Sequence, residues 1–159
     1  RNCDWSSDVC SSDLDLSAAQ LRAMASRHYP SGDVGAAIAS GSFPTLGMLI
    51  APCSIRTMSE IASGVTSSLL TRAADVVLKE RRRLVLMVRE TPLHTGHLRT
   101  MVQLSEMGAI IMPPVPAFYV RTANVEALVD QSVGRALDLF GLDLPQTQRW
   151  GIDVGPSSR

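Results

Sequence analysis

The sequence lacks an excess of charge of either sign. Its 15 lysines and arginines are balanced by 15 aspartates and glutamates, so the formal net charge at pH 7 is zero. A protein that binds nucleic acid or an anionic membrane surface through charge carries a basic excess, and this chain has none. No apolar run approaches the roughly 18 residues that a membrane-spanning helix needs. We therefore expect neither nucleic acid nor a membrane as a partner.

Cysteine is also scarce. Of the 3 cysteines, Cys3 and Cys10 lie within the first ten residues, so they do not form the regular framework of a disulfide-rich secreted domain. A reducing cytoplasm is the expected location. Cys53 has no nearby base in the sequence, and we interpret it as a small buried hydrophobic residue.

The first fourteen residues differ from the rest of the chain. Residues 1–14 are rich in serine, aspartate and cysteine, without helical or strand periodicity and without the apolar core of a secretory signal. They resemble translated sequencing-adapter DNA, and we expect a non-native segment in place of lost native sequence. The alternative is a genuine flexible N-terminal tail.

The remaining sequence is typical of one globular α/β domain. A length of 159 residues with 45% hydrophobic residues is sufficient for a single buried core. Short apolar runs, expected to be buried strands, alternate with helical patterns. The strands are predicted at 47–52, 84–88 and 109–112, and the helices at 16–28, 58–62, 69–79, 96–107 and 125–140. This order predicts a parallel sheet with right-handed crossovers.

The pattern also predicts which helical residues face the core. In the helix at 96–107 the inward residues are expected to be Leu98, Met101 and Val102, with Gly108 as the C-terminal cap. The last helix is expected to bury one apolar stripe, composed of Val125, Leu128, Val129, Val133, Leu137 and Phe140.

Candidate chemistry lies where the predicted strands end, because ligands of open α/β sheets bind at the carboxyl ends of the strands. Arg89 and Glu90 follow the strand at 84–88, and the alternative is that they pair with each other or with solvent. Residues 54–57 follow the first strand and open a helix whose N-terminus suits a phosphate. The alternative there is that Ser54 only caps the helix.

Several further side chains have both a structural and a functional interpretation. Lys79 and Arg81–Arg83 suit a solvated helix end. His94 and His97 have ligand spacing without a third ligand, which favours histidines at a helix N-terminus or an interface. Tyr119 follows a proline-rich turn that is suited to cover a ligand, and Arg135 either reaches solvent or meets an anion.

Six segments in order resemble one family, the UbiX/Pad-type flavin prenyltransferases, earlier described as aromatic acid decarboxylases. They include the Arg-Glu-Thr-Pro-Leu-His run at 89–94. The full set is 38–43, 48–54, 70–76, 78–82, 89–94 and 112–119. The resemblance runs from about residue 33 to residue 143.

The resemblance implies a flavodoxin-like, Rossmann-type sheet and a dodecamer whose active sites lie between subunits. It implies transfer of a dimethylallyl group from dimethylallyl phosphate to N5 and C6 of reduced FMN, without a metal. The product, prenylated FMN, would serve a UbiD-type decarboxylase, in ubiquinone biosynthesis or in aromatic acid breakdown. The absence of an Asp-rich diphosphate motif agrees with a metal-independent reaction.

By matched position, the resemblance implies roles for individual residues. Ser54, Ile55, Arg56, Thr57 and Arg89 would contact FMN. Lys79, Glu90, Tyr119 and Arg135 would surround dimethylallyl phosphate, with Arg72 reaching in from a neighbouring subunit and Trp150 near the site. The catalytic residues would be Glu90, Lys79 and Arg72. The cations would stabilise the departing phosphate, and Glu90 would relay a proton.

The sequence departs from the family at its N-terminus. The family begins with a strand and a Gly-Ala-Ser-Gly loop that holds the FMN phosphate, and neither has a counterpart here. We therefore expect a partial flavoprotein domain at 15–145, a C-terminal tail at 146–159, and weak or absent FMN binding. Two alternatives remain open. One is a non-catalytic subunit that binds flavin or builds an oligomer, and the other is a related FMN-dependent cysteine decarboxylase.

Overall fold

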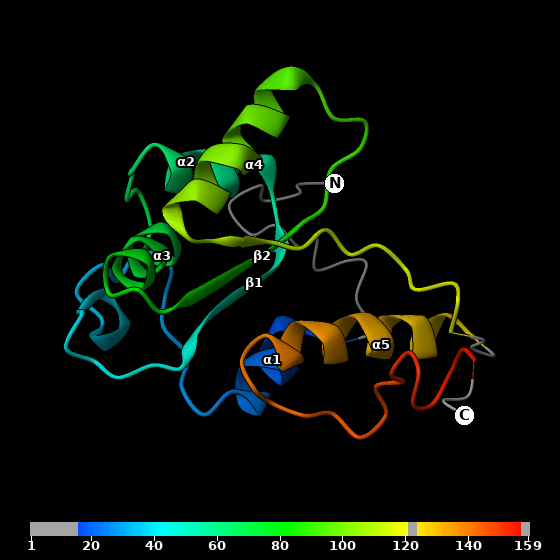
Figure 1. Ribbon diagram of the computed structural model, residues 1–159. Coiled ribbons are helices and arrows are strands. Elements are labelled where there is room, and N and C mark those ends of the chain that lie inside the picture. The colour runs from blue at the N-terminus through cyan, green and yellow to red at the C-terminus, as the bar shows by residue number, and fades with distance from the viewer. Residues whose placement is uncertain (1–15, 121–123, 157–159) are drawn as a thin grey trace.

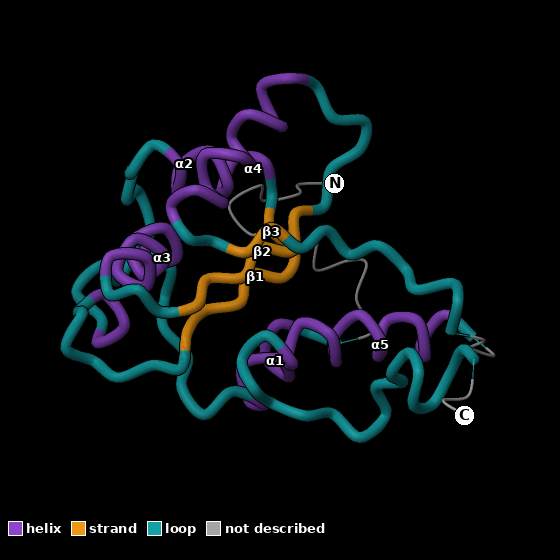
Figure 2. The backbone as a smooth tube through the Cα atoms, in the orientation of Figure 1, coloured by secondary structure: helices purple, strands orange, loops and turns teal. Residues whose placement is uncertain are grey.

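The computed structural model describes residues 16–120 and 124–156, and the segment at 1–14 lies outside them. The described chain contains one parallel sheet with the strand order β1-β2-β3. Its strands are β1 (Gly47–Cys53), β2 (Arg83–Val88) and β3 (Ile110–Ile111) (Figures 1 and 2). This confirms the predicted parallel α/β fold.

Helices lie on both sides of this sheet (Figure 1). Three of them, α2, α3 and α4, cover one face, and α1 and α5 lie on the opposite side. The bounds are α1 (Ala18–Met24), the 3-10 turn η2 (Ala37–Ala39), α2 (Ile55–Ala62), α3 (Leu69–Lys79), α4 (Thr95–Met107) and α5 (Val125–Asp138). Among the described residues, no helix is both long enough and apolar enough to cross a membrane.

β2 is the central strand, and its sequence explains its position. Its residues from Leu84 to Val88 are all buried, as expected for a parallel strand covered on both faces. β1 was predicted as a fully buried strand, but only Ile50 and Cys53 are buried in it. The ladder between β1 and β2 is irregular between these two residues, where β1 carries an extra residue and includes Pro52, which has no N–H to donate.

The core lies between the sheet and the three helices of one face. Its largest fully buried side chains include Met58 of α2, Leu84 and Leu86 of β2, and Leu104 of α4. Cys53 is also fully buried, which confirms its interpretation as a core residue. Gly108 ends α4 with a φ of 104°, a left-handed conformation that glycine adopts without steric cost, and it is the C-terminal cap as predicted.

The predicted inward face of α4 is wrong in part. Leu98 and Val102 are 49% and 57% exposed, whereas Leu104 is fully buried. Met101 packs against the core as predicted. α4 contacts α2 and β3, and helical spacing alone does not show which of its apolar residues face them. Part of its apolar surface is therefore left without a partner inside one chain.

The predicted stripe of α5 is also wrong in part, since Leu128, Leu137 and Phe140 are half-buried but its three valines are not. Val125, Val129 and Val133 are 74%, 54% and 40% exposed. The buried residues of α5 are instead Gln131, Gly134 and Ala136, none of which is a large apolar residue. The N-terminal helix is also shorter than predicted, since α1 spans Ala18–Met24 and contains no buried residue.

Candidate active site

The three strands end at one edge of the sheet, and each is followed by residues that the sequence singled out. Ser54 follows β1, Arg89 and Glu90 follow β2, and Met112 follows β3. The strands are parallel and adjacent, so these segments leave the sheet side by side. This is the edge at which open α/β folds bind ligands.

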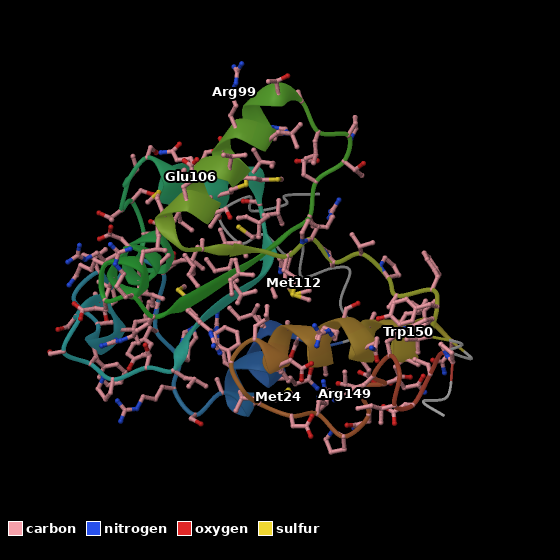
Figure 3. All side chains as sticks on the ribbon, in the orientation of Figure 1. Met24, Arg99, Glu106, Met112, Arg149 and Trp150 are labelled. Atoms are coloured by element: carbon pink, nitrogen blue, oxygen red, sulfur yellow. The ribbon has the colours of Figure 1, made fainter. Side chains whose placement is uncertain are left out.

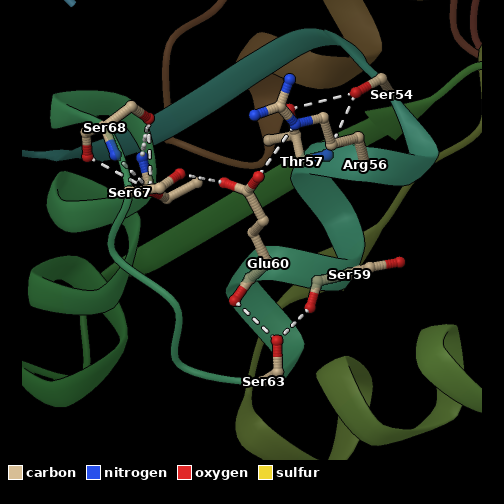
Figure 4. A network of polar contacts seen from close by, with 9 residues as sticks. Ser54, Arg56, Thr57, Ser59, Glu60, Ser63, Ser67 and Ser68 are labelled. Carbon is tan, nitrogen blue, oxygen red and sulfur yellow. Dashed lines mark hydrogen bonds and ion pairs between the residues drawn. The ribbon is translucent and has the colours of Figure 1, made fainter. Parts of the chain in front are cut away.

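The segment after β1 opens α2 in the manner of a capped helix. The Ser54 hydroxyl accepts a hydrogen bond from the Thr57 backbone N–H at 3.1 Å and donates one to Thr57 Oγ1 at 3.1 Å (Figure 4). The capping interpretation of Ser54 is therefore confirmed. The N–H groups of Ile55 and Arg56 lie in the same first turn, where a helix has no backbone acceptors of its own. The cap thus fixes a turn whose positive end faces the edge of the sheet.

The side chain of Arg56 points along α2 rather than toward its N-terminus. Its Nε lies 2.9 Å from Glu60 Oε1, and the Ser67 hydroxyl donates to the other carboxylate oxygen of Glu60 at 2.7 Å (Figure 4). The hydrogen bond from Ser67, with that from Arg56, holds the pKa of Glu60 below its ordinary value. In this arrangement Arg56 offers a ligand its backbone N–H, and its charge is directed at Glu60.

Arg89 and Glu90 are both exposed at the end of β2. No ion pair joins them in the part of the chain that the structure describes, so the sequence alternative of mutual pairing is not observed. One carboxylate oxygen of Glu90 accepts from the Thr91 N–H at 3.1 Å. This contact orients the carboxylate at the turn and leaves its second oxygen facing solvent or a ligand.

A cleft of about 330 Å³ lies beyond the end of β3. Its wall is mainly apolar, and it brings together Tyr119 and Arg135, which are 16 residues apart in the sequence. The lining residues are Met112–Ala117, Tyr119, Gln131, Ser132 and Arg135. Figure 3 shows Met112 between the sheet and α5. Arg135 forms an ion pair with Asp138, one turn further along α5.

Trp150 lies against Tyr119 at the edge of this cleft. The two rings meet edge to face, with centroids 5.4 Å apart and an interplanar angle of 88°. Trp150 and Arg149 belong to the C-terminal segment that runs beneath α5 (Figure 3). The tail predicted at 146–159 is therefore packed on α5 over its described part, up to residue 156.

Lys79 is not near these groups within one chain. It ends α3, where its Nζ lies 2.6 Å from Glu80 Oε1 and close to Gly41, while Glu90 follows the opposite end of β2. Arg72 lies on α3 about two turns before Lys79, and its Nη1 is 3.4 Å from Asp75 Oδ2. One subunit therefore does not bring Lys79 together with Glu90, Tyr119 and Arg135.

Arg82 has a structural role that the sequence interpretation missed. A solvated helix end was expected, but its guanidinium donates to the carbonyl oxygens of Gly41 at 2.6 Å and Phe43 at 2.8 Å. It also donates to the hydroxyl of Thr45 at 3.3 Å. These three contacts bind the loop before β1 to the end of α3. No sequence signal distinguishes Arg82 from its neighbours.

The two histidines confirm the helix N-terminal interpretation. His94 is the N-cap of α4, where its Nδ1 accepts from the Gly96 N–H at 3.0 Å, and its ring stacks on His97 with centroids 3.6 Å apart. Within residues 16–120 and 124–156, no group of three His, Cys, Asp or Glu side chains is placed to hold a metal ion.

Comparison with known proteins identifies the family. Residues 25–137 match the protein-family model described as Flavoprotein. Flavin prenyltransferase UbiX of Escherichia coli (strain K12) is 55% identical over 140 residues, which are 87% of this chain and 74% of that protein.

Solved structures agree with this result. The crystal structure of AnUbiX (PadA1) in complex with FMN and dimethylallyl pyrophosphate has a TM-score of 0.89 and 47% identity, covering 93% of this chain and 79% of that one. The dodecameric FMN-dependent UbiX-like decarboxylase from Escherichia coli O157:H7 has a TM-score of 0.88 and 44% identity, over 93% of this chain and 80% of that one. The chain therefore belongs to the UbiX flavin prenyltransferase family of flavoproteins.

Proposed function

We propose that this protein transfers a dimethylallyl group from dimethylallyl phosphate to reduced FMN and so makes prenylated FMN. The observation that carries the proposal is the cleft after β3. It combines an apolar wall at 112–117 with the guanidinium of Arg135, and it lies at the edge where Ser54 and Glu90 leave the neighbouring strands. An apolar wall beside a cation suits a short branched hydrocarbon that carries a phosphate.

The N-terminal turn of α2 suits the polar groups of FMN. Ser54 fixes the turn, and the N–H groups of Ile55 and Arg56 are its remaining donors. Thr57 is buried beneath the cap, and Arg89 is exposed on the neighbouring strand end. These are the five residues that we propose contact FMN. Reduced FMN supplies the nucleophilic N5, and the second new bond is to C6 of the flavin.

The allylic C–O bond of dimethylallyl phosphate breaks as the bond to N5 forms, and inorganic phosphate leaves with the electron pair of that bond. Arg135, Lys79 and Arg72 are proposed to stabilise the charge on this phosphate, since charge-assisted hydrogen bonds from preorganised cations are strongest in a site shielded from water. Tyr119 lines the cleft and Trp150 meets it edge to face, an aromatic pair that suits a developing allyl cation. N5 loses its proton as it is alkylated, the alkene gains a proton, and C6 loses one as the second bond forms; Glu90 is proposed to relay these protons. None of these roles requires a metal.

Lys79 and Arg72 would come from neighbouring subunits. The five Cα steps of β2 alone cover about 17 Å, which is too far for Lys79 to reach Glu90 of its own chain. Leu98 on α4 and Val129 on α5 are exposed and apolar. We propose that copies of the chain pack on the faces of α4 and α5 that carry them. A homo-oligomer, by analogy with the dodecameric relative, would place the residues together.

We propose that a second enzyme uses the product as its cofactor. Prenylated FMN would pass to a UbiD-type decarboxylase as its cofactor, in the cytoplasm. The chain itself would then be a supplier of cofactor and would not carry out the decarboxylation.

The test is the formation of prenylated FMN. The purified chain is mixed with dimethylallyl phosphate and saturating FMN that has been reduced with dithionite, and the flavin is analysed by mass spectrometry. Glu90→Gln and Lys79→Ala should each lower the yield at least tenfold without changing the oligomeric state. Glu106→Gln, the same change at an exposed site on α4, should have no effect.

Each alternative gives a different result. No product from the unchanged chain, with FMN still bound, would favour a flavin-binding or oligomer-building subunit. Carbon dioxide release from a peptidyl or pantothenoyl cysteine would favour the related decarboxylase. Full activity in Glu90→Gln would show that the assigned proton-transfer role is wrong.

A further inference from the structure

The C-terminal segment (residues 143–156) is bound to α5 by a buried amide. Gln131 is 2% exposed, and its side chain makes two hydrogen bonds to the backbone of Gln148. Nε2 donates to the Gln148 carbonyl oxygen at 2.8 Å, and Oε1 accepts from the Gln148 N–H at 2.9 Å. A buried amide that pairs with both the N–H and the carbonyl oxygen of one residue fixes the backbone of that residue in two directions.

Two further contacts act on the same stretch of chain. Thr147 packs directly over Gly134, so closely that a Cβ at Gly134 would lie 1.8 Å from Thr147 Oγ1. Arg149 donates to both carboxylate oxygens of Asp138, each at 3.0 Å. Gln131, Gly134 and Asp138 are spaced three and four residues apart, so they form one face of α5. That face binds three consecutive residues of the segment, 147 to 149.

The next residue is Trp150, and its own loop fixes its ring. The Gly151 N–H donates to the Val154 carbonyl oxygen at 2.7 Å, which closes a tight turn. A Cβ at Gly155 would lie 3.0 to 3.1 Å from the indole ring, so the backbone of Gly155 packs against one side of it. The indole also meets the ring of Tyr119 edge to face.

We propose that Gln131 is a positioning residue that fixes the backbone of Gln148 and thereby keeps Trp150 against Tyr119 at the edge of the cleft. Gln131 also lines the cleft, so it connects the ligand side of α5 with the segment on the other side. Its consequence for catalysis rests on the proposed function: the fixed pair of rings closes the aromatic side of the site around the dimethylallyl group. The geometry of the segment does not depend on that function.

The first test replaces Gln131 with Met, which has a similar shape but neither hydrogen-bonding group. The control is Gln103→Met, since Gln103 on α4 also donates to a backbone carbonyl, that of Ala62 at 2.8 Å, far from the segment in sequence. Trypsin cleavage of the Arg149–Trp150 bond, followed by mass spectrometry, reports release of the segment. Loss of two hydrogen bonds should accelerate this cleavage roughly tenfold or more in Gln131→Met, but not in the control.

A second readout follows Trp150 directly. The sequence has 2 tryptophans, and Trp5→Phe leaves Trp150 as the single emitter. Trp150 is 61% exposed, so acrylamide should quench it only modestly more when Gln131 is replaced and the indole loses its contact with Tyr119. Unchanged quenching and unchanged cleavage in Gln131→Met would overturn the proposal.

A second variant should release the C-terminal segment from α5 while Gln131 is kept. Gly134→Ala adds a methyl group where Thr147 now lies, and it should release the segment while raising the helix propensity of α5. Thr147 Oγ1 is buried and makes no hydrogen bond within the described residues, so Thr147→Ala is a mild change. The double variant Gly134→Ala/Thr147→Ala should restore slow cleavage. Rapid cleavage in the double variant but not in Gly134→Ala would contradict the packing argument.

Measurements of enzyme activity distinguish a failure of this proposal from a failure of the proposed function. In Gln131→Met the KM for dimethylallyl phosphate should rise about twofold or more, because only molecules with the segment in place bind it fully, whereas the FMN dissociation constant should stay unchanged. An unchanged KM together with faster cleavage would overturn the positioning role. If the unchanged chain forms no prenylated FMN, the proposed function fails, and cleavage and quenching alone decide whether Gln131 positions Trp150.

Discussion

The strongest prediction concerns the separation of Lys79 and Glu90. Each is proposed to act on the same substrate, yet within one chain they lie at opposite ends of β2. Their side chains can meet only if the site is built from two copies of the chain. We therefore predict that two inactive variants, Lys79→Ala and Glu90→Gln, restore activity to each other in mixed oligomers.

The expected recovery of activity follows from the distance between Lys79 and Glu90 within one chain. The five Cα steps from Arg83 to Val88 cover about 17 Å at the usual rise of a parallel strand, beyond the reach of a lysine side chain. If each site takes Lys79 from one subunit and Glu90 from another, random mixing at equal amounts leaves about one quarter of the sites with both native residues. Mixed oligomers should therefore recover about one quarter of the unchanged activity.

The assay is prenylated FMN measured by mass spectrometry on co-expressed, doubly tagged oligomers. Each variant alone should be at least tenfold less active than the unchanged protein. The control is the double variant Lys79→Ala/Glu90→Gln co-expressed with Glu90→Gln, which contains no site with both residues. If the mixture of single variants is as inactive as this control, the two residues act within one subunit or not together, and the assignment of Lys79 to a shared site is wrong.

Three other predictions follow from single contacts. Ser54→Ala and Ser68→Ala each remove a helix N-cap and should each cost about 1 kcal/mol in urea unfolding, but only Ser54→Ala should also weaken FMN binding. Arg82→Met should lower the unfolding free energy by about 2 kcal/mol, because three hydrogen bonds to the loop before β1 are lost; an unchanged urea midpoint would show that this loop needs no such support. The Arg149 guanidinium, followed by that of Arg135, holds the pKa of Asp138 below its ordinary value, so the ion pair is intact above about pH 4 and is lost as the pH falls through the lowered pKa. Acid should therefore increase acrylamide quenching of Trp150 in the Trp5→Phe background, and Asp138→Asn should show that increase already at pH 7.

The sheet and its ligand edge could be predicted because they depend on local patterns. A run of apolar, mostly branched residues at 84–88 is typical of a covered central strand, and strands that alternate with helices pair in parallel. The caps at Ser54 and Gly108 are equally local, since each depends on the conformation of one turn. Six motif segments in order were enough to indicate the family.

The faces of α4 and α5 could not be predicted in this way. Periodicity shows that Val102 and Val129 lie on apolar faces, but it does not show what covers them, and in one chain nothing among the described residues covers them fully. Of the three residues that α5 does bury, Gln131 is the largest, and it is polar. Its burial depends on a backbone peptide 17 residues away, which no sequence window contains.

The sequence alone therefore determined the fold class, the family and the edge of the sheet where ligands bind, because each follows from short patterns of residue types. The tertiary structure decided which of the candidate residues meet. It brought Tyr119 and Arg135 to one cleft, placed Trp150 against Tyr119, and left Lys79 near the far end of β2. The physical reason is that a strand separates its two ends by its full length, whereas a helix and the chain that returns beside it bring distant residues into contact.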